Sequence, residues 1–100
     1  MLRNLNLQDD RIGERGAMAL GQALEKNEAL RTLDLRSNDI GATGAATLGE
    51  SLHKNRALVE LDLRWNNIGK DNERVIARAL AAVRRNHLLD QNSAGYHGRA

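Results

Sequence analysis

The chain has 100 residues, with 15 lysine and arginine residues against 13 aspartate and glutamate residues and a net charge of +2. This excess is too small and too interspersed to favour nucleic acid or an anionic membrane as a partner. Cysteine is absent, which excludes a disulfide framework and a thiolate metal site, and no apolar run approaches the ~20 residues that a membrane span needs.

One pattern, LxxLxLxxNxIG, starts at positions 2, 30 and 58, so the sequence repeats every 28 residues. The first and second copies are identical at 14 of 28 aligned positions. The first copy departs from the pattern by carrying Asp10 at the asparagine position. A repeat of this length indicates that each unit is one supersecondary element stacked on its neighbours.

Each unit is predicted to open with a strand and to close with a helix. In the segment LRTLDLR (30–36), Leu33 and Leu35 alternate with polar residues, which is the period of a strand with one buried face. After Ile40 and Gly41 the apolar residues follow the helical spacing of three, four and seven. Strands that are separated by helices run parallel, and one unit cannot cover its own apolar face, so the units share one core.

The two ends of the chain differ in character. The first strand, around Leu5 and Leu7, has no partner on its outer edge, and an open edge invites another strand. We therefore expect either a dimer or a piece of a longer protein.

The third unit contains the segment DNERVIARALAAVRRN (71–86), which predicts a terminal helix. Its inward stripe follows from the helical spacing: Ile76, Leu80 and Val83. A second stripe lies on another side of the same helix: Val75, Ala79 and Ala82. We interpret the second stripe either as ordinary alanine-rich helix composition or as a surface for self-association.

The segments LRTLDLRSNDIG (30–41) and LVELDLRWNNIG (58–69) resemble leucine-rich repeats. The long segment after each one resembles the ribonuclease-inhibitor-like subclass, which also forms the sensor ends of NOD-like receptors. The resemblance implies an α/β fold, a right-handed strand and helix solenoid with a parallel sheet on the concave side and helices on the convex side. It also implies that Asn38 and Asn66 stack in a buried ladder whose amides satisfy backbone groups in the turns.

We expect one leucine-rich repeat domain at residues 1–89, followed by a polar, mobile tail at 90–100. The domain contains three repeats of 28 residues or slightly more: 2–29, 30–57 and 58–86. Secreted members of the family usually seal their ends with disulfides. The lack of cysteine and of an Asn-x-Ser/Thr sequon therefore favours a cytoplasmic location, with an effector delivered into a host cell as the open alternative.

The outward side chains of the strands predict a binding face. Equivalent residues of parallel strands lie side by side, so Asp34 is expected beside Asp62 and Arg36 beside Arg64, with diagonal Asp–Arg pairs between them. One interpretation is that these are solvated pairs, which contribute little to stability. The other is that a protein partner reads this surface, since arginine often dominates protein interfaces.

Trp65 is the only tryptophan of the chain and replaces Asp9 and Ser37 of the other units. Near the end of a strand, its ring cannot easily enter the core. The family resemblance implies that aromatic side chains on this rim contact the protein ligand. The alternative is a local cation–π contact with Arg36 or Arg64.

The sequence thus predicts a protein–protein interaction module that binds a protein partner of unknown identity through the concave sheet. Six residues are the first candidates for that contact: Asp34, Arg36, Glu60, Asp62, Arg64 and Trp65. The alternative is a self-associating or truncated repeat block whose role is oligomerisation, as a homodimer, through its uncapped ends. No enzyme, cofactor or metal is expected, because the histidines have no nucleophile or further ligand beside them at a suitable spacing.

Overall fold

The computed structural model describes the backbone of residues 2–99 and the side chains of residues 2–70 and 72–91. Three short strands alternate with helices along the chain. Their bounds are β1 (Asn4–Asn6), α1 (Gly13–Lys26), β2 (Thr32–Asp34), α2 (Gly41–Leu52), β3 (Glu60–Asp62), the 3-10 helix η1 (Lys70–Asn72) and α3 (Glu73–Arg99). The α/β alternation expected from the sequence is present.

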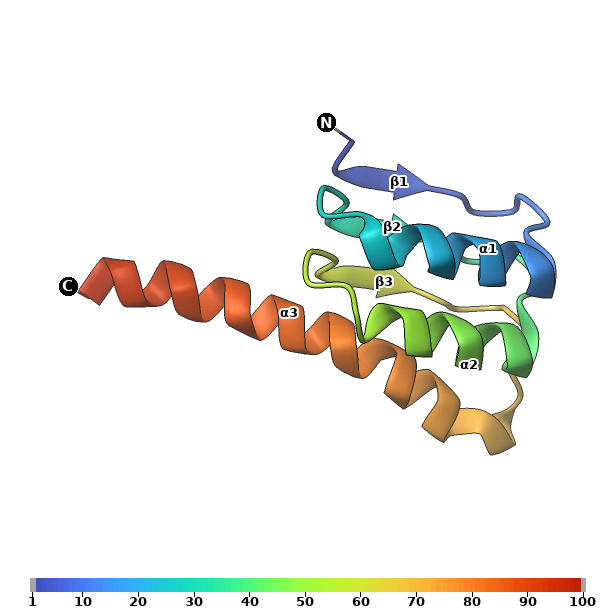
Figure 1. Ribbon diagram of the computed structural model, residues 1–100. Coiled ribbons are helices and arrows are strands. Elements are labelled where there is room, and N and C mark those ends of the chain that lie inside the picture. Colours follow the sequence, from blue (N-terminus) through green and yellow to red (C-terminus); the bar gives the residue numbers. More distant parts are fainter. Residues whose placement is uncertain (1, 100) are drawn as a thin grey trace.

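The strands form one parallel sheet in the order β1-β2-β3. Its register pairs residues that are 28 positions apart, as in Leu5 opposite Leu33 and Leu33 opposite Leu61. Helices α1 and α2 lie side by side along one face of the sheet, and α3 runs on beyond it toward the C-terminus (Figure 1). The other face of the sheet presents the side chains of Asn4, Asn6, Thr32, Asp34, Glu60 and Asp62, and no helix of the described chain lies over it at β1 and β2 (Figure 1). We call it the open sheet face.

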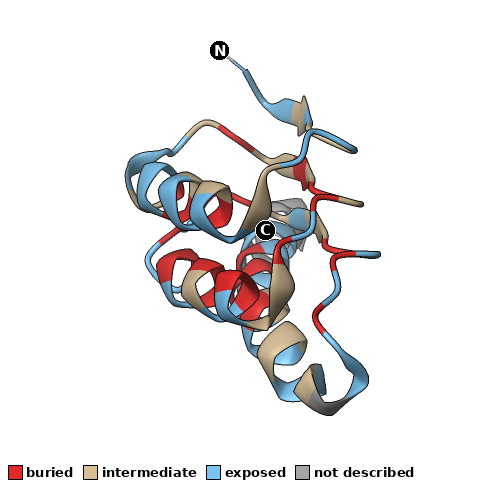
Figure 2. Cartoon of the chain, turned by 90° about the vertical axis from the view of Figure 1, so that its right-hand side faces the viewer, coloured by how far each residue is buried: buried red, intermediate tan, exposed pale blue. Residues whose placement is uncertain are grey.

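The core lies between the sheet and the helices. Its largest fully buried apolar side chains come from the second unit and from the start of the third: Leu35, Ile40, Leu48, Leu52 and Leu58. Figure 2 shows buried residues along α2 and after the strands, whereas the outer side of α1 is exposed. The middle unit is the most buried because it alone has a complete neighbour on each side.

The turns after the three strands repeat one another closely. The backbone adopts positive φ angles at Asp9, Ser37 and Trp65, and again two residues later in each unit. Gly13, Gly41 and Gly69 also have positive φ and lead into the helical part of each unit, a conformation that costs glycine little. Because the turns at 28-residue intervals have the same backbone conformation, the chain leaves each strand in the same direction.

The predicted asparagine ladder holds these turns together. Asn38 is 1% exposed, and its Oδ1 accepts hydrogen bonds from the backbone N–H groups of Asp10 (2.8 Å) and Ile12 (3.3 Å). Its Nδ2 donates to the carbonyl oxygens of Leu7 (2.8 Å) and Leu35 (3.0 Å). Asn66 makes the same set of bonds one unit later. The amide therefore satisfies groups in its own turn and in the preceding one.

A second ladder, which the sequence reasoning did not propose, runs through the loops that precede the strands. Asn55 Nδ2 donates to the carbonyl oxygens of Leu24 (2.8 Å) and Asn27 (3.1 Å). Asn86 Nδ2 donates in turn to the carbonyl oxygens of Asn55 (2.9 Å) and Leu58 (3.0 Å). Asn86 follows Asn55 by 31 residues instead of 28, and its two acceptors are likewise three residues beyond the repeat positions, so the amide lies about one helical turn further along α3.

The helix contacts keep the register of the repeat. A Cβ added at Gly21 would lie 3.1 Å from the Cβ of Ser51, and one added at Gly49 would lie 3.4 Å from the Cβ of Ala79. Ala79 is 28 residues beyond Ser51, so α3 packs on α2 as α2 packs on α1. The residue of α3 that corresponds to the two close-packed glycines is therefore Ala77.

The C-terminal segment differs from the expectation. A helix was predicted to end near residue 86, but α3 continues through Arg99. The segment after Asn86 contains no proline, and its first glycine is at position 95, so nothing stops the helix earlier. The predicted mobility of residues 90–100 stays a prediction, and most of that segment lies outside the described side chains. None of the helices in residues 2–99 has both the length and the apolar character that crossing a membrane requires.

Candidate functional site

The open sheet face carries two nearly identical ion pairs. Arg36 Nη2 lies 2.6 Å from Asp34 Oδ2, and Arg64 Nη2 lies 2.8 Å from Asp62 Oδ2. In both, the carboxylate also accepts the backbone N–H of its own arginine at 3.1 Å. This hydrogen bond from the backbone N–H two residues further along fixes the carboxylate where the guanidinium can bind it.

The expected diagonal contact is present but weaker. Arg36 Nε lies 3.6 Å from Asp62 Oδ2, across the two strands. The four residues lie together as predicted. The sequence did not predict that the ion pairs within one unit would be shorter than the pair between units. The first unit shows the same geometry without charge, because Asn6 Oδ1 accepts the backbone N–H of Gln8 at 2.9 Å.

These contacts shift the titration of both carboxyl groups. The hydrogen bonds from the Arg36 side chain lower the pKa of Asp34 below its usual 3.8, against a smaller opposing effect of burial. The pKa of Asp62 is lowered in the same way by Arg64. The pKa of each arginine is raised, chiefly by its bond to the carboxylate. The network is therefore fully ionised at neutral pH.

Two of the predicted residues stand apart from this network. Glu60 lies on the same face but forms no ion pair with any side chain that the structure describes. Trp65 follows β3 in the turn and is 65% exposed. Its ring lies under the guanidinium of Arg64, with 5.1 Å between Arg64 Cζ and the ring centroid. The local cation–π alternative is thus present with Arg64, and contact with a partner stays a prediction.

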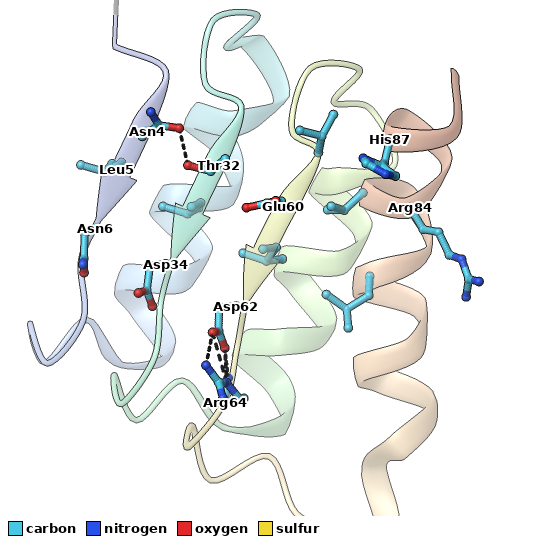
Figure 3. A pocket seen from close by; sticks show the side chains of 15 residues that line it. Asn4, Leu5, Asn6, Thr32, Asp34, Glu60, Asp62, Arg64, Arg84 and His87 are labelled. Atoms are coloured by element: carbon cyan, nitrogen blue, oxygen red, sulfur yellow. Dashed lines mark hydrogen bonds and ion pairs between the residues drawn. The ribbon is translucent and has the colours of Figure 1, made fainter. Parts of the chain in front are cut away.

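A groove of about 770 Å³ extends along this face (Figure 3). Its polar floor comes from all three strands, and its wall beside β3 comes from α3. The polar floor residues are Asn4, Asn6, Thr32, Asp34, Glu60, Asp62 and Arg64. The apolar residues Leu5, Leu33, Val59 and Leu61 line the groove from the same side, and the wall residues are Leu80, Val83, Arg84 and His87. In Figure 3 the side chain of His87 lies between β3 and α3, whereas Arg84 points away from the sheet.

The wall was not predicted. Leu80 and Val83 were expected on the inward stripe of the last helix, and that helix was expected to end at about residue 86, before His87. The available signal was the absence of any helix breaker between Asn86 and Gln91. Three side chains hold this part of α3 in place. Asn86 donates to the carbonyl oxygens of Asn55 and Leu58, Arg85 donates to those of His53 and Asn55, and Asp90 pairs with Arg31 at 2.9 Å.

The proposed self-association stripe requires a correction. Ala79 and Ala82 are 0% and 2% exposed and belong to the core, and Val75 packs against that core. Ala79 meets Gly49 of α2, so this side of α3 faces its own chain. Ala79 repeats the buried position of Ser51, which meets Gly21 one unit earlier. Ala79 and Ala82 therefore leave no surface for a second copy.

Comparison with known families agrees with this architecture. A family model described as Leucine Rich repeat matches residues 26–49 and 54–71, which include β2, β3 and much of α2. The matches support a leucine-rich repeat protein. Domains of this class generally mediate protein–protein interaction and are typically not enzymes. No curated protein was found that matches the chain.

Proposed function

We propose that this chain binds a protein partner through its open sheet face, which would be the concave side of a right-handed solenoid of three ribonuclease-inhibitor-like repeats. Six residues are proposed to form the contact: Asp34, Arg36, Glu60, Asp62, Arg64 and Trp65. The proposal rests mainly on the conformation and exposure of Trp65, and the ion pairs and the groove add to it.

Trp65 occupies a position that does not suit tryptophan. Its φ of 61° lies in the left-handed region, where Asn and Asp are the favoured non-glycine residues. The equivalent positions carry Asp9 and Ser37, which are small and polar. A bulky residue with this backbone conformation costs on the order of 1 kcal/mol. Because the side chain is 65% exposed, its burial offsets little of that cost. An unfavourable and exposed aromatic side chain is best explained by a contact outside the chain.

The charged network supports the same face. Because each guanidinium is already held by a carboxylate, little side-chain freedom remains to be lost when a partner binds. Arg36 and Asp34 keep about a quarter of their side-chain surface exposed, and Arg64 keeps 61%. The surface thus offers ordered donors and acceptors of both signs, which favours a partner with mixed charge over a uniformly acidic or basic one.

The groove gives this surface a depression that a partner can enter. Its floor carries polar side chains from the strands, whereas its wall beside β3 includes the apolar side chains of Leu80 and Val83 next to Leu61. Leu61 and Leu80 are half-buried and so retain apolar surface that a partner can cover. A protein segment with an apolar side facing α3 and a polar side facing the floor would match both.

The test compares the full chain with variants as immobilised bait, with retained proteins quantified by mass spectrometry. Trp65→Asn and the pair Arg36→Glu/Arg64→Glu are expected to lose the specific partner. The matched control is Arg74→Glu/Arg78→Glu, which makes the same charge change on exposed positions of α3 away from the sheet face. Trp65→Asn should keep or slightly raise the midpoint of urea unfolding. Retention of the same proteins by all baits, with the variants folded, would contradict the proposal.

A further inference from the structure

The two edges of the sheet differ, and the difference determines where another chain can add. At the β3 edge, α3 runs beside the strand (Figure 3), and its Val83 belongs to the core. Helices α1 and α2 end at Lys26 and Leu52 and lead back to the next strand, whereas α3 continues through Arg99 without turning into a further strand beside β3. This edge is therefore closed by α3.

The outer edge of β1 is open along its length. The N–H groups of Leu7 and Asp9 point inward and donate to the carbonyl oxygens of Asp34 (2.9 Å) and Arg36 (3.1 Å). Because alternate residues of a strand point their backbone groups to opposite sides, the N–H and C=O groups of Asn4 and Asn6 face outward. No strand or helix in the described chain lies beyond them (Figure 1).

The leucines of the first unit are less buried than the equivalent leucines of the second unit. Leu33 in β2 and Leu35 directly after it are 2% and 0% exposed. Their counterparts Leu5 and Leu7 are only half-buried, and Leu2 is 61% exposed. The same side chains in the same register are thus fully covered where a strand lies on both sides and incompletely covered where one side is empty. A strand that added to β1 would remove this deficit.

The charges of β1 suit a second copy in antiparallel orientation. On the open sheet face β1 presents the neutral amides of Asn4 and Asn6, whereas β2 and β3 present carboxylates that like-charge repulsion would keep apart. Arg3 precedes the strand, and Asp9 and Asp10 follow it. Antiparallel pairing brings the arginine of each copy toward the acidic pair of the other, whereas parallel pairing would place like charges together.

We infer that β1 is a self-complementary edge through which two copies of this chain form a closed, twofold-symmetric dimer by antiparallel pairing of β1 with β1. The contact uses the same surface on both copies, so it is isologous and stops at two. The closed β3 edge prevents growth into a filament. This inference does not depend on the proposed partner, because the six partner-binding candidates lie on β2, β3 and the turns that follow them.

The test measures the solution mass of the full chain by sedimentation velocity and light scattering over a dilution series from near-millimolar to micromolar. The expected result is a reversible shift between one and two copies of the 11.0 kDa chain. Arg3→Glu should weaken dimerisation by about tenfold, because two symmetry-related attractions become repulsions. Arg3→Glu/Asp10→Arg should restore it by exchanging the two signs.

The matched control is Arg15→Glu, an identical charge change at an exposed position of α1. Amide exchange gives an independent measurement, since the outward N–H groups of Asn4 and Asn6 should gain protection only at concentrations where the dimer forms. A monomer at every concentration would overturn the inference. It would also be overturned by species larger than a dimer, or by a dimer that Arg3→Glu leaves unchanged. None of these outcomes bears on partner binding.

Discussion

Single side chains on the open sheet face act through the backbone as much as through their charges. Asp34 and Asp62 each accept a backbone N–H and a guanidinium at once, which is why strand position alone was not enough to predict the pairing. The sequence showed that aspartates and arginines would line up in columns. Whether an arginine turns to its own strand or to the next depends on side-chain rotamers, which periodicity does not encode.

This network makes stability depend on pH in the acidic range. Because the pKa of Asp34 and of Asp62 is lowered in the folded state, their ionised forms stabilise the fold above the ordinary value of 3.8. That contribution is lost as the pH falls through the folded-state pKa. The urea midpoint should therefore fall more steeply between about pH 5 and about pH 2 in the natural chain than in Asp34→Asn/Asp62→Asn. Equal slopes for the two proteins would show that the pairs contribute nothing, as many exposed ion pairs do.

At the scale of elements, each turn is held by an asparagine that serves two units. The sequence and the family resemblance together predicted this ladder at Asn38 and Asn66, because the residue type recurs at a fixed position after each strand. The second ladder through Asn55 and Asn86 escaped prediction. Its last member lies 31 residues after the previous one, so an alignment at 28 residues places Val83 there instead.

The ladder gives a matched pair of substitutions. Asn38→Asp keeps the oxygen that accepts from Asp10 and Ile12 but removes the donor to Leu7 and Leu35, and it adds a charge at a site that is 1% exposed. We expect the free energy of unfolding to fall by about 3 kcal/mol. Asp10→Asn is the reverse change at the exposed first rung and should alter it by less than about 0.5 kcal/mol. Urea denaturation measures both, and a similar loss for the two would refute the role of the donor.

At the scale of the whole molecule, α3 departs from the repeat and closes one end of the stack. The repeat pattern predicted three units, and the longer last segment predicted a terminal helix. It did not predict that α3 continues through Arg99, nor that Asn86 reaches Asn55 one turn beyond the position that a 28-residue spacing gives. Ala82, which one interpretation placed on a surface for self-association, belongs to the core.

Asn86 should control how α3 is attached. The side chain is 3% exposed, and Asn86→Ala would leave the carbonyl oxygens of Asn55 and Leu58 without its amide, at a cost of about 2 kcal/mol. Since each unit contacts only its neighbours, amide exchange should speed up in α3 and β3 before it does in β2. His87→Ala, an exposed neighbour on the same helix, is the control and should leave exchange unchanged. Uniform loss of protection along the chain would instead show that the molecule opens as one unit.

The length of α3 also determines how the length of this protein can change. An additional 28-residue segment appended after α3 would follow a helix that continues through Arg99 instead of turning back toward the sheet, so growth at that end would require rebuilding the helix. A segment inserted between the first and second units would meet a β1 and β2 register that already repeats without change. Duplication can therefore lengthen the chain from within while α3 is carried along unaltered.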